Sequence, residues 1–206
     1  MFQTNIIDNS TYSLLREICQ DQQYSLFALA GGTALALILG HRESIDLDFF
    51  TTEAFDSVKL AEGLSNKYDL TEITTSNNSI SCFIWHKNKN IKVDFLRHNY
   101  NILAPILNEE NVRLLSIEDI AAMKLNAIAN RGAKKDFFDI YSLLEEFQLK
   151  NMLKFFEQKY PQFNSFSVIK SLTFFDDAEN EPDPISLIAL EWEEVKNKIN
   201  SEVRVI

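Results

Sequence analysis

Apolar and polar residues alternate in one short segment of the N-terminal half, and this alternation predicts a β-strand. Residues 45–50, Ile-Asp-Leu-Asp-Phe-Phe, place apolar side chains at every second position, which is the period of a half-buried strand. An apolar run before it predicts a buried strand over 24–30. The other elements expected in this half are helices over 10–22 and 53–66, and strands over 69–74, 79–86 and 90–96.

The predicted boundaries come from capping and turn residues. Ser10 or Thr11 would cap the first helix, and Thr51 or Thr52 would cap the second, because their hydroxyl groups can accept from free helix N–H groups. Polar residues over 86–90 predict a hairpin turn between the last two strands.

After residue 110 the apolar spacing becomes helical. Ser116 opens a sequence typical of a capping box, so a helix is expected to continue to about Arg131. Further helices are expected over 134–147, 150–159, 163–173 and 185–202, with an acidic loop over 176–184. This loop is interpreted as solvated, and the alternatives are an interaction surface or a mobile element near the cleft between the lobes. The patterns together predict an α+β fold with a mixed αβ lobe over 1–110 and a helical lobe over 111–206.

Composition narrows the class of protein. Apolar residues make up 46% and charged residues 24% of the chain, as in ordinary globular proteins. No apolar run approaches the roughly 18 residues of a membrane-spanning helix, and the first five residues lack the basic flank of a signal peptide. Cys19 and Cys82 form no metal motif. We therefore expect a cytoplasmic protein with buried thiols and no membrane partner.

The net charge bears on nucleic-acid binding. Twenty Lys and Arg against 30 Asp and Glu give a net charge of −10. Broad, nonspecific binding to nucleic acid depends on neutralising phosphates, so this charge argues against it. A local basic site remains open, and an acidic chain is well suited to binding a divalent metal ion.

Three aspartates are candidate metal ligands. Asp46 and Asp48 are two residues apart on a predicted strand, so both carboxylates lie on one face, roughly 6.6 Å apart along the chain. Asp94 lies on a later predicted strand. If the two strands are neighbours, three carboxylates meet, and such a group suits a two-metal site for phosphoryl chemistry. The alternative is that each aspartate is a solvated surface residue.

A glycine-rich turn precedes these aspartates. Gly31, Gly32 and Thr33 lie between a predicted strand and a short helix from Ala34 to Leu39. Glycines allow close backbone approach to a phosphate, and a helix start offers free N–H groups. The hydroxyl group of Thr33 would add a donor. The alternative is an ordinary tight turn that caps a helix.

The helical half contains a lysine on an apolar face and an acid that can pair with it. Lys124 shares a helix face with Ile117, Ala121 and Ile128, so it needs a partner or a substrate phosphate if it is buried. One hypothesis is that Asp136 faces Lys124 and is its partner. The alternatives are a lysine whose head reaches solvent and an acid that only favours the start of its helix.

Four segments in this order resemble the AbiEii/AbiGii toxin branch of polymerase-beta-like nucleotidyltransferases. They are Gly31-Gly32-Thr33-Ala34-Leu35, Arg42 to Phe49 with its Asp-Leu-Asp, Lys92-Val93-Asp94, and the helical stretch from Ile120 to Tyr141 with Lys124, Arg131 and Lys135-Asp136. The resemblance covers about residues 25–147.

The resemblance implies a fold and the roles of the site residues. The fold is an N-terminal nucleotidyltransferase lobe with a mixed sheet, followed by a helical lobe. Asp46, Asp48 and Asp94 would be catalytic residues whose carboxylates bind Mg²⁺ or Mn²⁺. Lys124 would lie near the nucleotide phosphates and Asp136 would be the following motif acid. Arg131 would assist with phosphate or brace Asp136.

The resemblance also implies a reaction and partners. Relatives transfer a nucleoside monophosphate from an NTP to RNA, including tRNA ends, or in distant branches to protein hydroxyls. Many are toxins of two-gene systems that abort phage infection, so a cognate antitoxin is an expected partner. The alternatives are an aminoglycoside-type adenylyltransferase acting on a small molecule and a catalytically inactive nucleotide-binding module. Lysines that would form a small basic rim are Lys87, Lys89, Lys92, Lys134 and Lys135.

Overall fold

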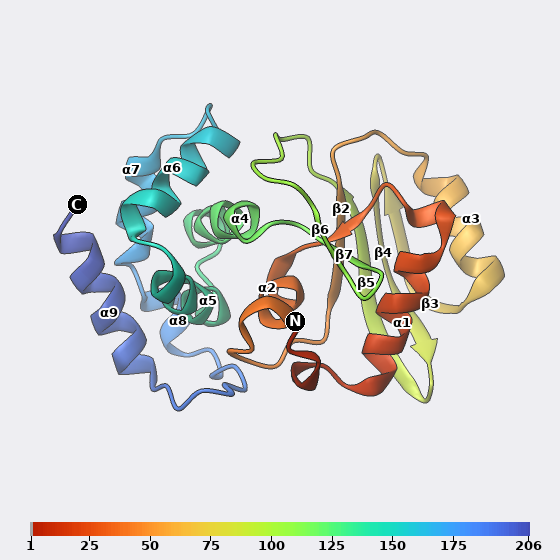
Figure 1. Ribbon diagram of the computed structural model, residues 1–206, viewed down its shortest axis with the longest axis horizontal. Helices are drawn as coiled ribbons and strands as arrows, with labels where there is room; N and C mark the ends of the chain where they lie inside the picture. The colour runs from red at the N-terminus through yellow and green to blue at the C-terminus, as the bar shows by residue number, and fades with distance from the viewer. Residues whose placement is uncertain (1) are drawn as a thin grey trace. The chain divides into compact units, whose positions relative to one another are not determined.

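The chain is divided between two structural units, one built on a β-sheet and one built of helices (Figure 1). The computed structural model describes residues 2–206. Met1, the first of the five residues considered above for a signal peptide, lies outside the described residues. Unit 1 consists of residues up to 38, 44–100 and 106–115, and unit 2 of 39–43, 101–105 and 116–206. This α+β architecture, a sheet-bearing N-terminal part followed by helices, confirms the predicted fold class.

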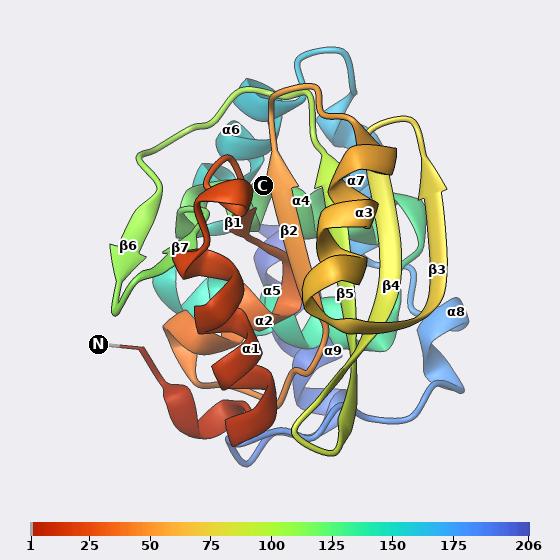
Figure 2. The same cartoon turned by 90° about the vertical axis from the view of Figure 1, so that its right-hand side faces the viewer.

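Unit 1 contains a seven-stranded mixed sheet, which Figure 2 shows with its strands side by side. The strands lie in the order β3-β4-β5-β2-β1-β7-β6. Strand β2 pairs in parallel with β5, and β1 in parallel with β7, whereas all other neighbours are antiparallel. Their bounds are β1 Ala28–Leu29, β2 Leu47–Thr51, β3 Asp69–Ser76, β4 Ser79–His86, β5 Lys89–Arg97, β6 Leu107–Glu109 and β7 Val112–Leu114.

The first predicted strand is much shorter than expected. The prediction covered 24–30, but residues 22–24 form a short 3-10 helix and only Ala28 and Leu29 pair as β1. The short strands β6 and β7 were not predicted at all. Both misses involve segments of two or three paired residues, for which alternation gives no usable signal.

The helices of unit 1 are capped by aspartates that the sequence prediction overlooked. Helix α1 spans Asn9–Gln20 and α3 spans Ser57–Lys67, with Asp8 and Asp56 as the residues that accept N–H groups of the first turn. The predicted hydroxyl caps at 10–11 and 51–52 were therefore wrong. Helix α2 spans Gly31–Leu39, so the two glycines are its first residues and not a separate turn.

A two-residue turn sets the register of the β4–β5 hairpin. Lys87 and Asn88 both have positive φ, 47° and 64°, as the tight turns favoured between antiparallel strands require. The predicted turn around 86–90 is confirmed. From this turn outward the register pairs His86 with Lys89 and Ser81 with Asp94.

Aromatic side chains fill the core of unit 1. The rings of Phe49 on β2 and Phe95 on β5 are stacked with centroids 5.1 Å apart, and Phe27 meets Phe95 edge-on at 5.0 Å. All three are buried. Leu47 is also buried, so the apolar positions of the predicted alternating strand face the core, and Asp48 lies on the opposite face.

Unit 2 is helical along most of its length. Its helices are α4 Ile117–Asn130, α5 Lys134–Glu146, α6 Leu149–Lys159, α7 Ser165–Leu172, α8 Asp176–Glu179 and α9 Trp192–Arg204. Ser116 caps α4 as predicted. The last helix begins at residue 192 and not at 185, because Glu191 and Glu194 form the capping box there.

The acidic segment over 176–184 is held by Lys134 and is not wholly free in solvent. It contains the short helix α8, and the backbone N–H of Lys134 donates to Glu181 Oε2 at 2.8 Å. The Lys134 ammonium group reaches Asp183 Oδ1 at 3.0 Å and lies 5.2 Å from the centre of the Trp192 ring.

Among the helices of residues 2–206, none combines the length and the apolar composition that a membrane-spanning helix needs.

A fully buried ion pair anchors the segment 101–105 to the helices of unit 2. Lys159 Nζ lies 2.6 Å from Asp119 Oδ1, and neither side chain is exposed. Lys159 also donates to the carbonyl of Asn101, and Asp119 accepts from the backbone N–H groups of Leu103 and Ala104. These bonds satisfy the buried carboxylate that would otherwise destabilise the unit.

Replacing Lys159 by methionine leaves the Asp119 carboxylate buried without its cation. We expect the free energy of unfolding to fall by about 3–5 kcal/mol, measured by urea denaturation. Lys154→Met, which removes an exposed lysine of the same helix, should change stability by no more than about 0.5 kcal/mol. Equal stability of the two variants would contradict this assignment.

Candidate functional site

Two of the three predicted metal ligands lie on neighbouring strands. In the parallel pair β2–β5, Asp48 is the register partner of Asp94, so both side chains lie on the same face of the sheet. Asp46 directly precedes β2. We call Asp46, Asp48 and Asp94 the acidic group. The pairing of the two strands, on which the prediction of a shared site depended, is therefore present.

Lys92 and Ser81 are the immediate partners of Asp94. Lys92 Nζ lies 3.0 Å from Asp94 Oδ2, and the Ser81 hydroxyl group donates to Asp94 Oδ1 at 2.5 Å. The hydrogen bond to Asp94 raises the pKa of Lys92 against the opposing effect of burial, and the charges of Asp46 and Asp48 also contribute. All three carboxylates thus act electrostatically on one ammonium group.

The acidic group has the donor chemistry of a magnesium site but is not a preassembled one. Its ligand atoms would all be carboxylate oxygens, which Mg²⁺ prefers. Over residues 2–206, however, no three His, Cys, Asp or Glu side chains are gathered closely enough to hold a metal ion. The type of donor atom suits the ion that the resemblance implies, and the function of these residues as its ligands stays a prediction.

Gly31 lies directly against Asp48. Its φ is +68°, and a Cβ at this position would be 2.5 Å from Asp48 Oδ2, closer than any real contact. The backbone N–H of Ala30 donates to the Asp48 carbonyl at 2.8 Å. The start of α2 and the acidic group are therefore neighbours, which brings the free N–H groups of a helix terminus close to the carboxylates.

Thr33 holds the segment that leads into β2. Its side chain is 1% exposed, and its hydroxyl group donates to the carbonyl of Asp46 and lies 2.8 Å from Ser44 Oγ. This contact positions Asp46. A direct contact of Thr33 or Gly32 with a nucleotide phosphate stays a prediction.

In unit 2, the predicted residues Lys124, Arg131 and Asp136 join in one buried ion network. Lys124 Nζ lies 3.0 Å from Asp136 Oδ1 and contacts Asp139 Oδ2 at 2.5 Å. Arg131 donates to both oxygens of Asp136, at 2.7 and 3.0 Å. The buried ion network comprises His41, Arg42, Lys124, Arg131, Asp136 and Asp139.

Lys124 is sealed inside this network. Its side chain is 6% exposed and the two carboxylates that it meets are 0% exposed, so the alternative of a lysine head in solvent was wrong. Burial opposes the charge of Lys124, but Asp139 and Asp136 outweigh it and raise its pKa. Its predicted contact with a nucleotide phosphate would require a phosphate oxygen to compete with these carboxylates.

Asp139 is the centre of the network. Arg42 donates to both of its oxygens, at 2.7 and 2.9 Å, and His41 Nε2 lies 2.7 Å from Oδ1. Burial alone would raise the pKa of Asp139, but Lys124 and Arg42 hold it well below 3.8. Lys124 and Arg131 likewise lower the pKa of Asp136.

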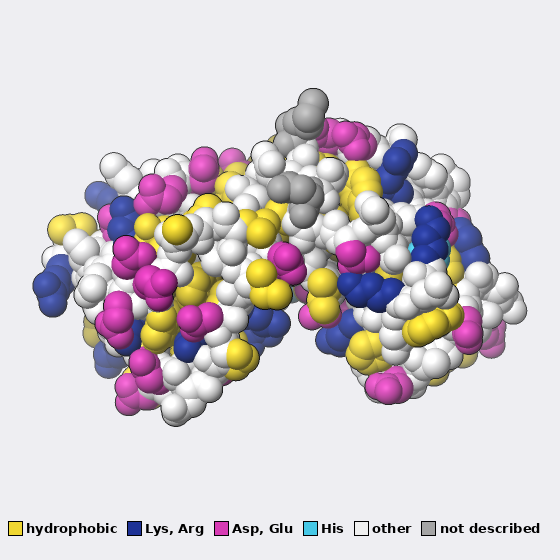
Figure 3. All heavy atoms as spheres, turned by 90° about the horizontal axis from the view of Figure 1, so that it is seen from below, with side chains coloured by type: hydrophobic (Ala, Val, Ile, Leu, Met, Phe, Trp, Pro, Cys, Tyr) yellow, Lys and Arg dark blue, Asp and Glu magenta, His cyan; other side chains and the backbone are white. Residues whose placement is uncertain are grey.

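Most lysines of the predicted basic rim are paired or buried, although Lys135 is exposed. Lys87 donates to Ser13, Lys89 pairs with Asp8, and Lys134 is 5% exposed. On the face drawn in Figure 3, Lys and Arg side chains lie in small groups among Asp and Glu. Neither observation supports a continuous basic surface for RNA.

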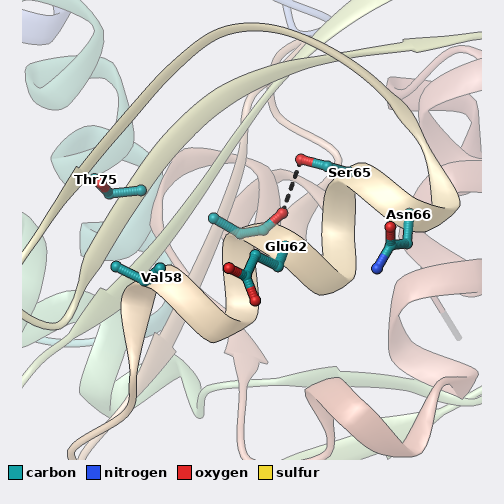
Figure 4. Close-up of a pocket in the computed structure, with 6 residues that line it drawn as sticks. Val58, Glu62, Ser65, Asn66 and Thr75 are labelled. Atoms are coloured by element: carbon teal, nitrogen blue, oxygen red, sulfur yellow. Dashed lines mark hydrogen bonds between the residues drawn. The ribbon is translucent and has the colours of Figure 1, made fainter.

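A surface hollow of unit 1 lies between α3 and β3 (Figure 4). Its volume is about 430 Å³, and it is lined by Val58, Ala61, Glu62, Ser65, Asn66 and Thr75. The Ser65 hydroxyl group donates to the carbonyl of Ala61 in its own helix. None of the lining residues is a predicted site residue, so this hollow adds nothing to the acidic group.

Sequence reasoning did not assign His41, Ser81 or Lys92 to the sites where they lie. Ser81 could have been found, because a two-residue turn at 87–88 fixes its pairing with Asp94. His41 gave no local signal, since its contact with Asp139 joins residues 98 positions apart.

The fold is shared with nucleotidyltransferases of known structure. The chain is similar to a putative nucleotidyltransferase from Helicobacter pylori, with a TM-score of 0.58, 20% identity, and coverage of 95% of this chain and 92% of that one. JHP933 from Helicobacter pylori gives a TM-score of 0.56 at 19% identity over 95% and 89% of the chains. MenT4, a nucleotidyltransferase toxin from Mycobacterium tuberculosis H37Rv, gives 0.53 at 15% identity over 97% and 86%.

Sequence similarity then gives the family. Residues 13–204 match the model of the AbiEii nucleotidyltransferase toxins of type IV TA (toxin–antitoxin) systems, and the chain belongs to this family. A relative from Aquifex aeolicus (strain VF5), described as uncharacterized protein aq_aa25, is 34% identical over 193 residues, which cover 91% of this chain and 88% of that protein. The family predicted from the motifs is confirmed.

Replacing Gly31 by alanine should displace the Asp48 carboxylate. The contact at 2.5 Å and the positive φ together should lower the free energy of unfolding by about 1–3 kcal/mol, measured by urea denaturation. In an Asp48→Ala background the same replacement should have a smaller effect, because the contact with Oδ2 is removed and only the backbone strain and the milder 3.3 Å contact with the Cβ of residue 48 remain. Additive effects of the two replacements would contradict a direct contact.

Asp139→Asn should destabilise the protein at neutral pH by about 3–5 kcal/mol. Because the folded-state pKa of Asp139 lies below its ordinary value of 3.8, its contribution to stability is present above about pH 4. That contribution is lost as the pH falls through the folded-state pKa.

Urea denaturation at a series of pH values measures this effect. The difference in stability between the natural protein and Asp139→Asn should be constant near neutral pH and should shrink below about pH 4. Glu146→Gln, at an exposed position of the same helix, should show no such difference. A difference that persists unchanged at low pH would contradict the assignment of the charge to Asp139.

Proposed function

We propose that this member of the AbiEii family is a nucleotidyltransferase, dependent on Mg²⁺ or Mn²⁺, that transfers a nucleoside monophosphate from an NTP to a hydroxyl group of RNA or protein. The observation that carries the proposal is the register pairing of Asp48 with Asp94, with Asp46 at the entrance to the same strand. The family match supports the reaction class and a role as the toxin of a toxin–antitoxin pair.

The acidic group would provide the reacting centre. Bound divalent ions would neutralise triphosphate charge and lower the pKa of the attacking hydroxyl group. Asp46 and Asp48 would hold the ions through carboxylate oxygens. Asp94, whose position Ser81 fixes, would accept the proton of the acceptor hydroxyl. The oxygen of the acceptor hydroxyl group would then attack the α-phosphorus of the NTP, and pyrophosphate would leave.

The neighbouring backbone would accommodate the triphosphate. Gly31 lacks a side chain at the point where α2 begins beside Asp48, and the free N–H groups of this helix start favour negative charge. Gly32 and Thr33 complete the predicted phosphate-binding segment, with Thr33 acting mainly through its hold on Asp46.

The buried ion network would contribute mainly through Arg131. Its side chain is 57% exposed, whereas that of Lys124 is 6% exposed. We therefore propose that Arg131 presents positive charge to a nucleotide phosphate while it braces Asp136, and that Lys124 holds Asp136 and Asp139 in place.

The acceptor is best sought among both RNA and protein. The net charge of −10 argues against broad attraction to RNA, so an RNA acceptor would have to be recognised locally. A small-molecule acceptor and a catalytically inactive nucleotide-binding module are the competing hypotheses. Incubation with each labelled NTP, Mg²⁺, and total RNA, protein and aminoglycosides identifies which class becomes labelled.

Asp48→Asn should strongly reduce the rate of transfer while the fold is kept. The loss of one carboxylate charge at the reacting centre is expected to lower the rate by about 10² or more, measured as labelled acceptor per unit time. Asp69→Asn, which removes an exposed carboxylate of β3, should leave the rate unchanged. Transfer at the natural rate by a folded Asp48→Asn protein would refute the proposed function.

A further inference from the structure

Lys92 lies beside the acidic group and is in direct contact with Asp94. It is two residues from Asp94 on β5, so both side chains lie on the face of the sheet that also carries Asp48. Its ammonium group is 3.0 Å from Asp94 Oδ2. Asp46 and Asp48 also act on it electrostatically.

Asp94 has both carboxylate oxygens engaged. Ser81 donates to Oδ1 and Lys92 meets Oδ2. The Lys92 side chain is 39% exposed, whereas that of Asp94 is 13% exposed. Lysine has a flexible four-carbon stem and a hydrated head, so the ammonium group is the partner that can withdraw to solvent when a cation of higher charge arrives.

We propose that Lys92 is an internal counter-ion of the acidic group, which pairs with the Asp94 carboxylate in the nucleotide-free protein and is exchanged for a divalent cation. Lys92 is in this sense a positioning residue and not a catalytic one. The inference rests on the proposed function, since it requires the acidic group to bind metal.

The exchange has two physical consequences. Without metal, Lys92 relieves the repulsion among carboxylates on one face of the sheet, so it stabilises the empty site. With metal, the ion must compete with an ammonium group that is part of the same chain, so Lys92 weakens metal binding. A lysine that served only to bind a nucleotide phosphate would have neither effect on the nucleotide-free protein.

The test measures Mn²⁺ binding by calorimetry, and thermal stability in EDTA, without nucleotide. Lys92→Met should bind Mn²⁺ about fivefold more tightly than the natural protein, and its Tm in EDTA should be lower by about 2–4 °C. Lys92→Arg keeps the cation and should restore most of the Tm. Both measurements are independent of transfer activity.

Lys89→Met is the matched control. Lys89 is also on β5 and is also paired with a carboxylate, that of Asp8, but that carboxylate is not a member of the acidic group. It should leave Mn²⁺ affinity unchanged. Any loss of stability in Lys89→Met measures the effect of removing a lysine ion pair outside the acidic group, and the loss in Lys92→Met is compared with it.

Two results would overturn the inference. One is a Lys92→Met protein that binds Mn²⁺ no more tightly than the natural protein, and the other is an unchanged Tm in EDTA. If Asp48→Asn strongly reduces both transfer and Mn²⁺ binding while Lys92→Met has no effect on Mn²⁺ affinity, the proposed function stands and the role of Lys92 fails. If Asp48→Asn transfers normally, the proposed function itself fails.

Discussion

The parallel pairing of β2 with β5 is the constraint on which the candidate site depends. Asp48 lies on β2, with Asp46 directly before that strand, and Asp94 lies on β5, which follows about 45 residues later. Only the pairing of the two strands makes these residues neighbours. The register is fixed on the other face of the sheet, where Leu47, Phe49 and Phe95 are buried. A shift by one residue would turn the aspartates into the core, so the hydrophobic core keeps the carboxylates together.

This arrangement brings negatively charged carboxylates close together, and neighbouring residues of unit 1 reduce the repulsion between them. Ser81 donates to Asp94 from β4, and Lys92 adds a positive charge from β5. Gly31 gives the Asp48 carboxylate room that any other residue would take. Each of these residues adapts the fold to a cluster of negative charge that contributes nothing to packing, and this pattern is expected where function, and not stability, selects the residues.

In unit 2, buried carboxylates are paired with cationic side chains. In the buried ion network, three cationic side chains, Arg42, Lys124 and Arg131, share the carboxylates of Asp136 and Asp139. Buried ion pairs of this kind add little net stability, but removal of one partner is strongly destabilising. His41 Nδ1 has no hydrogen-bond partner among the described residues although it is buried. The network therefore holds its helices in one arrangement and leaves only the Arg131 side chain substantially exposed.

The sequence by itself determined the α+β class, most of the longer helices and strands, the β4–β5 turn and the family. These features depend on local periodicity, on capping and turn residues, and on motifs of adjacent residues such as Asp46-Leu47-Asp48. It did not give the caps at Asp8 and Asp56, because several neighbouring residues could serve, nor the strands β1, β6 and β7 with their true bounds. The sequence suggested Asp136 as the partner of Lys124 and Arg131, and the structure shows both contacts. Only the tertiary structure decided the other buried ion pairs. Asp139 meets Arg42 across 97 positions of chain, and such contacts depend on how whole elements pack, which no local pattern records.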